Sequence, residues 1–412
     1  MYIRRAIETA IKRAVKTFPA IVVTGPRQSG KTTLLKNMFP STHKFITLEN
    51  PDIREMALED PNGFLKLYSP PVIFDEIQYA PDLLSYIKTK IDNNRKPGLW
   101  LFTGSQSFAL MQGISESLAG RAAVFNLYPL SLAEINMNSL SNLTTADFVK
   151  KVKTPDQPKI ADFSSNITIA DWILRGGYPE LALNYQVDRD IWSSSYATTY
   201  LERDVRQIIN VTDLNLYNKF LRMCATFSGC ILNESQMANT IGISIPTVKR
   251  WLSVLITGGI IFLLSPYFKN IGKRLIKRPK LYFVDTALAS FLLGIHEKEI
   301  LLSGPSFGNL FETAVISDFL KRFFNHGISP SLYYIRTQDG LETDLVIDIN
   351  GKLYLFEIKS SSTLRPKHTS ALKRWTSYFE NSAVAGGVIG CQDEYLPLSA
   401  DIHGIPWKAL AL

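Results

Sequence analysis

The sequence predicts an α/β protein with a parallel sheet in its N-terminal part and a second α/β region in its C-terminal part. Short apolar runs rich in β-branched residues alternate with helical patterns from residue 20 to residue 127. This alternation is typical of a parallel sheet covered by helices on both faces. A second series of strand-like runs begins near Asn309 and continues to the C-terminus. Residues 217–267, between the two regions, have a different and largely helical pattern.

The individual elements follow from hydrophobic periodicity. Apolar residues recur at helical spacing from Ile3 to Val15, with Arg4, Arg5 and Lys12 between them, which predicts an amphipathic helix with a basic outer face. A polar stretch at 138–162 predicts an exposed connection, and helices follow at 169–207. A helix is also expected at 31–38, and strands at 20–24, 44–48, 72–74, 99–103, 123–127, 331–335, 343–348, 353–359 and 385–389.

A glycine-rich turn joins the strand at 20–24 to the helix at 31–38. Its pattern is G-x-x-x-x-G-K-T, and a strand before it with a helix after it is the context of a phosphate-binding loop. Backbone amides and the helix N-terminus attract phosphate charge there. We expect Lys31 to contact the β- and γ-phosphates and the Thr32 hydroxyl to bind Mg²⁺. The predicted nucleotide-binding residues are Gly25, Pro26, Arg27, Gln28, Ser29, Gly30, Lys31, Thr32 and Thr33.

Two later strand ends carry polar side chains suited to the same site. The apolar run at 71–74 ends in Asp75 and Glu76. Asp75 is expected to hold the Mg²⁺ shell, and Glu76 to orient or deprotonate the attacking water. The strand at 99–103 ends near Ser105 and Gln106, either of which could sense the γ-phosphate. The alternative is a glycine-rich turn beside two solvated acids that do no chemistry.

These motifs resemble a large prokaryotic family of AAA-type ATPases with a C-terminal domain of unknown function. The matching segments are 23–34, 75–78, 103–105, 118–121, 176–180, 200–205, 342–344 and 357–359. The resemblance implies an ATPase that uses ATP with Mg²⁺. It also implies four parts, namely an AAA-type core at 1–137, a connection and helical lid at 138–214, a winged helix-turn-helix at 215–282 and a C-terminal domain at 283–412.

The resemblance further implies an arginine finger near Arg121, which would act on the nucleotide of a neighbouring subunit in a homo-oligomer. The alternative is a surface arginine that pairs with an acid. Arg203 and Arg206 are rival candidates, although Glu202 and Asp204 beside them favour internal ion pairs.

The middle segment has the pattern of a winged helix-turn-helix. A short helix from Asn233, a glycine turn, a cap at Ser244 and a second helix at 245–256 are followed by a strand at 260–264. Residues 269–280 then carry six cations and no acid: Lys269, Lys273, Arg274, Lys277, Arg278 and Lys280. We expect this region to contact DNA phosphates. The alternative is a packing or protein-binding module with a solvated basic face.

The C-terminal region contains Asp344 on one predicted strand, and Glu357 and Lys359 on the next. Residues two apart on a strand share a face, so a hairpin brings the three side chains together. This arrangement resembles the PD-(D/E)XK nuclease fold, in which the carboxylates hold Mg²⁺ and the lysine positions the water. Glu312, on a predicted helix, could add a carboxylate. The alternative is an inherited fold without cleavage, in which the acids pair with Lys359.

Bulk properties limit the function classes. The net charge of +8 permits a polyanionic partner, and three cysteines without zinc spacing indicate reduced thiols. The N-terminus lacks the apolar core of a signal peptide, and the apolar run at 252–264 is too short to span a bilayer. We therefore expect a soluble, cytoplasmic ATPase that acts on DNA and has a metal-dependent nuclease-like domain. The alternative is an ATP-dependent signalling switch whose C-terminal domain is a non-catalytic protein-binding module.

Overall fold

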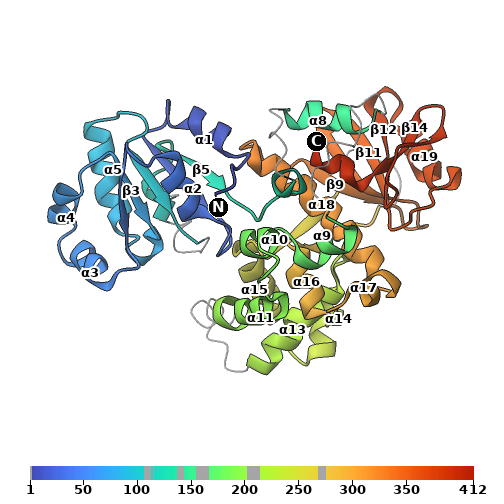
Figure 1. The fold of residues 1–412 in the computed structure, drawn as a ribbon, viewed down its shortest axis with the longest axis horizontal. Helices are drawn as coiled ribbons and strands as arrows, with labels where there is room; N and C mark the ends of the chain where they lie inside the picture. The colour runs from blue at the N-terminus through green and yellow to red at the C-terminus, as the bar shows by residue number, and fades with distance from the viewer. Residues whose placement is uncertain are drawn as a thin grey trace. The chain divides into compact units, whose positions relative to one another are not determined.

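The computed structural model describes residues 2–105, 113–114, 116–136, 143–154, 167–201, 214–267 and 275–412 (Figure 1). They form two compact units. The first contains residues 1–129 with 257–259 and 324–328, and the second contains the remainder. Each unit has its own sheet, of five strands in the first and nine in the second. The α/β class predicted from the sequence is therefore confirmed.

The sheet of the first unit is parallel and has the strand order β2-β3-β4-β1-β5. Its strands are β1 (Ala20–Thr24), β2 (Lys44–Thr47), β3 (Val72–Asp75), β4 (Trp100–Thr103) and β5 (Ala122–Asn126). All five agree with the sequence prediction to within one residue at each end. Because parallel strands end at one edge, the loops after β1, β3 and β4 lie together there.

Helices cover both faces of this sheet: α1 (Glu8–Ala14), α2 (Lys31–Met38), α3 (Pro51–Glu59), α4 (Pro61–Leu67) and α5 (Leu83–Asn93). Alternate strand residues point to opposite faces. Val22 and Phe102 pack in the core under α3, α4 and α5, whereas Ile21 and Leu101 pack under α1 and α2 (Figure 1). Two buried faces explain why these strands are continuously apolar rather than alternating.

The second unit is built from helices and one mixed sheet, in the order β13-β14-β12-β11-β10-β9-β7-β8-β6. Its strands are β6 (Cys230–Ile231), β7 (Ile261–Pro266), β8 (Lys280–Phe283), β9 (Leu332–Arg336), β10 (Glu342–Ile349), β11 (Lys352–Lys359), β12 (Ala383–Gly390), β13 (Leu396–Ser399) and β14 (Ile402–Pro406). Its α-helices are α7 (Leu132–Ile135), α8 (Thr145–Val152), α9 (Ile169–Arg175), α10 (Pro179–Leu183), α11 (Arg189–Tyr196), α13 (Leu214–Thr226), α14 (Glu234–Ile241), α15 (Ile245–Thr257), α16 (Thr286–Leu292), α17 (Lys298–Ser303), α18 (Phe307–Asn325) and α19 (Ser370–Phe379).

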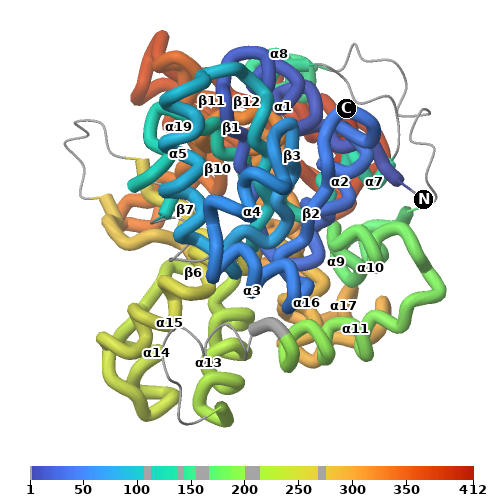
Figure 2. Tube along the Cα trace, turned by 90° about the vertical axis from the view of Figure 1, so that its left-hand side faces the viewer, coloured from blue at the N-terminus to red at the C-terminus, as the bar shows by residue number. Residues whose placement is uncertain are grey.

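Three helices, α13, α14 and α15, lie side by side in the second unit (Figure 2). Gly242 separates α14 from α15 in the left-handed conformation, and the Thr247 N–H donates to Ser244 Oγ at the start of α15, as the glycine turn and cap predict. The antiparallel pair β7–β8 follows, and β6 adds to β8. The helix, glycine turn, second helix and strand follow in the order that the sequence predicts, whereas α13, β6 and β8 were not predicted.

The structure differs from the sequence expectations at the stretch 138–162 and at the boundary of the C-terminal domain. The stretch at 138–162 was expected to be an exposed connection, but α8 lies within it and buries Phe148, Val149 and Val152. The polar residues between these three lie on the outer face of an amphipathic helix, so the polar composition of the stretch did not indicate that a helix with a buried face lies there. The expected domain boundary between residues 282 and 283 falls inside β8, and β7 pairs with β9, so one sheet runs through both segments.

The Gly176-Gly177 pair has a structural role in the second unit. A Cβ on Gly176, whose φ is +60°, would stand 2.2 Å from Asp285 Oδ1, and one on Gly177 would stand 2.2 Å from the Leu130 carbonyl oxygen. The Gly177 N–H donates to Asp285 Oδ2 over 2.7 Å. Only glycine permits this close approach of backbone and carboxylate.

Candidate functional site

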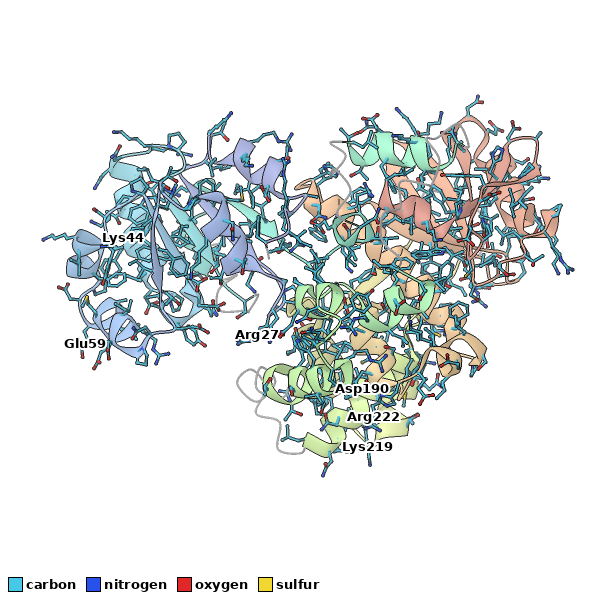
Figure 3. All side chains as sticks on the ribbon, viewed as in Figure 1. Arg27, Lys44, Glu59, Asp190, Lys219 and Arg222 are labelled. Atoms are coloured by element: carbon cyan, nitrogen blue, oxygen red, sulfur yellow. The ribbon has the colours of Figure 1, made fainter. Side chains whose placement is uncertain are left out.

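The glycine-rich loop connects β1 to α2 and has a backbone that suits phosphate. Gly25 and Gly30 have φ of +140° and +95°, and a Cβ on Gly25 would lie 2.2 Å from the Leu127 carbonyl oxygen. No side chain caps the N-terminus of α2, so the helix presents its first turn to the loop. Arg27, which is labelled in Figure 3, belongs to this loop.

Lys31 is folded against the loop that it belongs to. Its ammonium donates to the carbonyl oxygens of Pro26 at 2.8 Å and Gly25 at 3.2 Å, and the residue is buried. The neighbouring Ser29 hydroxyl is fully buried and makes no hydrogen bond to any residue that the structure describes. An unsatisfied buried hydroxyl beside a buried ammonium is costly unless a ligand completes their contacts. These residues therefore fit an anionic group held in the loop.

Arg5 binds backbone carbonyl oxygens in and near the glycine-rich loop, a role that the sequence did not suggest. Its guanidinium donates to the Ser29 carbonyl oxygen at 2.9 Å and the Tyr128 carbonyl oxygen at 2.8 Å. The expectation that Arg5 lies on an outward basic face is wrong, because α1 begins only at Glu8 and the turn before it places Arg5 in the interior.

Asp75 is the centre of a hydroxyl cluster at the end of β3. Its Oδ1 accepts from Thr32 Oγ1 at 2.6 Å and Thr103 Oγ1 at 2.5 Å, and its Oδ2 accepts from Thr47 Oγ1 at 3.2 Å. The structure thus brings the predicted pair Thr32 and Asp75 into contact. Thr47 and Thr103 had no signal in the sequence, because a threonine at a strand end is common in any sheet.

Glu76 and Ser105 are connected by a third side chain, that of Gln78. The Gln78 amide nitrogen donates to the Glu76 carboxylate and, over 3.0 Å, to Ser105 Oγ. The Glu76 backbone is left-handed, with φ of +57°, and its N–H donates to Thr103 Oγ1. Gln78 Oε1 is buried and accepts no hydrogen bond from the part of the chain that the structure describes. Gln106 lies outside the described residues.

Arg121 binds an acid of its own unit. Its Nε and Nη2 donate to Asp92 Oδ1 and Oδ2 at 2.6 and 2.9 Å, and this hydrogen bond, more than any charge, lowers the pKa of Asp92. The arrangement is that of the surface ion pair considered as the alternative to an arginine finger. Arg203 and Arg206 lie outside the described residues.

The second unit brings together Asp344, Glu357 and Lys359. Leu345 pairs with Phe356 across the β10–β11 hairpin, so Asp344 stands beside Glu357. Lys359 Nζ lies 3.1 Å from Asp344 Oδ2 and 2.8 Å from Glu357 Oε2. Burial, and secondarily the Asp344 charge, raise the pKa of Glu357 to about 8. Glu357 Oε1 is buried and has no hydrogen-bond partner among the described residues.

A second charged cluster lies close to the first. Lys280 Nζ contacts Glu312 Oε1 at 3.0 Å and Glu342 Oε1 at 2.7 Å, and the Tyr282 hydroxyl donates to Glu312 Oε1 at 2.5 Å. Arg336 pairs with Glu342 at 2.9 Å. Glu312 is thus held by Lys280, and the nearby charge of Asp344 and, above all, burial raise its pKa.

The structure removes Lys280 from the predicted DNA surface. This lysine was counted among six outward cations, but its side chain is only 5% exposed and is engaged by two carboxylates. Lys277 and Arg278 are exposed, whereas Lys269, Lys273 and Arg274 lie outside the described residues. The α15 face with Pro246, Arg250 and Ser253 is exposed, and α13 adds the outward Lys219 and Arg222 (Figure 3). Lys249, also exposed, pairs with Glu234 at 3.5 Å.

Within the parts of the chain that the structure describes, no group of three or more His, Cys, Asp or Glu is arranged to hold a metal ion. Asp344 and Glu357 form a group of two, and the orphaned Glu357 oxygen is the donor that a divalent ion would satisfy. Over the same described ranges, no helix has the length and apolar character needed to cross a membrane.

Three family models match the chain. Residues 17–136 match an AAA domain, residues 166–299 a domain of unknown function (DUF8612), and residues 307–410 another domain of unknown function (DUF4143). The AAA match covers the five-stranded sheet and the loop that holds Lys31. The other two matches name no activity.

The chain is similar to two uncharacterized relatives and, among other solved structures, to a Walker-type ATPase. Uncharacterized protein Rv2008c of Mycobacterium tuberculosis (strain ATCC 25618 / H37Rv) is 30% identical over 362 residues, which cover 87% of this chain and 74% of the relative. Uncharacterized protein Mb2031c of Mycobacterium bovis (strain ATCC BAA-935 / AF2122/97) gives the same values. The Walker-type ATPase PABY2304 of Pyrococcus abyssi is 15% identical with a TM-score of 0.45, covering 71% of this chain and 96% of that one.

Proposed function

We propose that this chain, which belongs to the same family as Rv2008c and Mb2031c and contains an AAA-type P-loop ATPase domain, hydrolyses ATP. We propose further, from the α14–α15 arrangement and the cations described below, that it acts on DNA. The observation that carries the ATPase half is the meeting of Thr32, Asp75 and the Lys31 loop at one edge of the sheet. Phosphate contacts and a carboxylate–hydroxyl pair for Mg²⁺ are the parts that phosphoryl transfer needs.

Each residue of this edge has a proposed task. Lys31 turns from the Pro26 carbonyl oxygen to the β- and γ-phosphates, while Thr32 and Asp75 hold Mg²⁺. The ion, when bound, neutralises charge on the phosphates. Glu76 would accept the proton of the attacking water, and Ser105, whose hydroxyl accepts from Gln78, would contact the γ-phosphate.

Two variants separate binding from turnover. Lys31→Ala should lower ATP affinity by about tenfold or more, because charge-assisted contacts are worth roughly 1.5–3 kcal/mol. Calorimetry with ATP and Mg²⁺ measures this affinity, and Lys36→Ala on the same helix is the matched control. Undiminished affinity in Lys31→Ala would remove the loop from the mechanism.

The DNA half rests on the α14–Gly242–α15 arrangement followed by the β7–β8 hairpin, which supports a winged helix-turn-helix. The exposed face of α15 carries Lys249 and Arg250, and the residues before β8 carry exposed Lys277 and Arg278. Such cations contact phosphates and make affinity fall with salt. Duplex DNA that neither binds nor alters ATP turnover would exclude this half of the proposal.

The C-terminal cluster supports metal-dependent cleavage as the action on DNA. Asp344 and Glu357 would hold a divalent ion, which when bound polarises the scissile phosphate, and Lys359 would donate to the water or phosphate. A second function is favoured by a specific observation: Lys359 already contacts both carboxylates, which is the arrangement expected if the domain does not cleave and serves only to bind other proteins. Plasmid nicking with Mn²⁺, lost in Asp344→Ala while ATP turnover persists, distinguishes the two.

A further inference from the structure

A small basic cavity adjoins the Asp344–Glu357–Lys359 cluster, on the loop that follows β11. It has a volume of about 350 Å³, and its lining includes Lys359, Ser361, Thr363, Arg365, Lys367 and His368. None of the described residues that line it is acidic. Arg365 and Lys367 are exposed, and no carboxylate of the described chain pairs with either. Arg365 and Lys367 therefore give the cavity positive charge that no carboxylate of the described residues compensates.

The loop that forms this cavity is held in one conformation by its own hydrogen bonds. Thr363 N–H donates to Ser361 Oγ over 3.1 Å, and Ser361 Oγ donates to the Thr363 carbonyl oxygen over the same distance. Arg365 N–H donates to His368 Nδ1 over 3.2 Å, so the neutral imidazole carries its proton on Nε2. The backbone that carries Arg365 and Lys367 is thus ordered before any ligand arrives, which reduces the part of the ordering cost of binding that the backbone would contribute.

We propose that this cavity binds a phosphodiester group of a nucleic-acid strand and holds it next to the Asp344–Glu357–Lys359 cluster. Lys359 lines the cavity and also contacts both carboxylates, so one residue connects the two sites. The cavity volume suits a phosphate with part of its sugar, and hydroxyl, guanidinium and ammonium donors are the groups that recognise phosphate oxygens. The inference rests on the proposed action on DNA and assigns that action a binding subsite.

The first test is DNA binding by the full chain. The double variant Arg365→Ala/Lys367→Ala should bind a labelled DNA duplex at least about tenfold more weakly. Its salt dependence should flatten by about two units, one for each lost phosphate contact. The control, Lys352→Ala/Arg374→Ala, removes two exposed cations of the same unit that do not line the cavity. An unchanged urea unfolding curve, followed by tryptophan fluorescence of the second unit, shows that both variants fold.

The second test does not depend on DNA. Dimethyl phosphate is titrated into the full chain while histidine side-chain resonances are followed, and His368→Gln identifies one signal among five. Burial and the charges of Lys367, Lys359 and Arg365 lower the pKa of His368, so a bound anion should raise it. A saturable shift of that resonance supports the cavity, and no response at any concentration overturns it.

The outcomes separate this inference from the proposed function. If Lys249→Ala/Arg250→Ala weakens DNA binding and the cavity variant does not, the cavity assignment is wrong and action on DNA stands. If the wild-type chain binds no DNA, the proposed function fails, and the histidine titration alone decides whether a phosphodiester binds here. A cavity that responds to ATP and inorganic phosphate but not to dimethyl phosphate would overturn the diester assignment.

Discussion

Replacing Lys359 with Met removes the cation between Asp344 and Glu357 and keeps most of the side-chain volume. The lysine nitrogen lies 3.1 and 2.8 Å from the two carboxylates. At an effective dielectric constant of about 20, unit charges at such distances attract by roughly 5–6 kcal/mol. Lysine hydration offsets much of this, since its side chain is 36% exposed. We therefore expect a net loss of about 2–3 kcal/mol, below the roughly 3–5 kcal/mol of a fully buried pair.

The pH dependence of this loss is the sharper expectation. The pKa of Glu357 is raised to about 8 in the folded protein, so its contribution to stability is complete below the unfolded pKa and is lost as pH rises toward 8. Above pH 8 the Glu357 carboxyl is ionised in both the folded and the unfolded wild-type protein, so its contribution to stability no longer changes with pH. Without Lys359 the folded pKa rises further, so the variant should keep losing about 1.4 kcal/mol per pH unit above pH 8.

Urea unfolding between pH 6 and 9.5 measures both effects. Tryptophan fluorescence reports mainly on the second unit, because five of the six tryptophans lie there and only Trp100 lies in the first. Lys352→Met, an exposed lysine on the same strand, is the control. Parallel stability curves for Lys359→Met and wild type above pH 8 would show that Lys359 does not neutralise the pair, and the reasoning would fail.

Three other perturbations test the remaining assignments. Glu76→Gln should retain ATP affinity by calorimetry and lower phosphate release at least about 100-fold, and turnover near that of wild type would move the base elsewhere. Arg121→Ala should leave turnover within a few-fold, because its guanidinium already binds an acid of its own unit; a loss of about 10³ would identify an arginine finger. Lys277→Ala/Arg278→Ala should flatten the salt dependence of duplex binding by about two units, and an unaltered slope would remove these cations from the DNA surface.

The sequence predicted those parts of the site that depend on neighbours in the chain. The loop from Gly25 to Thr32 is local, because its glycines, lysine and helix start follow one another. Asp344, Glu357 and Lys359 could be grouped because a hairpin and a period of two fix which side chains share a face. In each case the pattern contains the geometry, so no knowledge of the rest of the fold is needed.

Residues that act through tertiary contacts gave no such signal. Arg5 supports the phosphate loop from a turn that helical periodicity cannot distinguish from a helix, and Thr103 reaches Asp75 only because β3 and β4 are neighbours in the sheet. The sequence suggested that Lys280 is solvated like the other cations of residues 269–280, because the composition of a segment does not show which of its side chains is buried. The burial of Lys280 depends on Glu312 and Glu342, which lie more than thirty residues away in the chain.

The distribution of charge around Asp344 indicates which lysine a metal ion can replace as the partner of the carboxylates. Lys280 is 5% exposed and fixed by two acids, whereas Lys359 is 36% exposed and lines the basic cavity. A phosphodiester in that cavity would compete with the carboxylates for the Lys359 ammonium and leave them free for a divalent ion.

Metal and phosphodiester should therefore bind cooperatively, and by linkage each should raise the affinity of the other by the same factor. Titrating Mn²⁺ with and without dimethyl phosphate measures this factor, which Lys359→Met should reduce to one. Equal Mn²⁺ affinities in the wild-type protein would show that Lys359 does not connect the two sites.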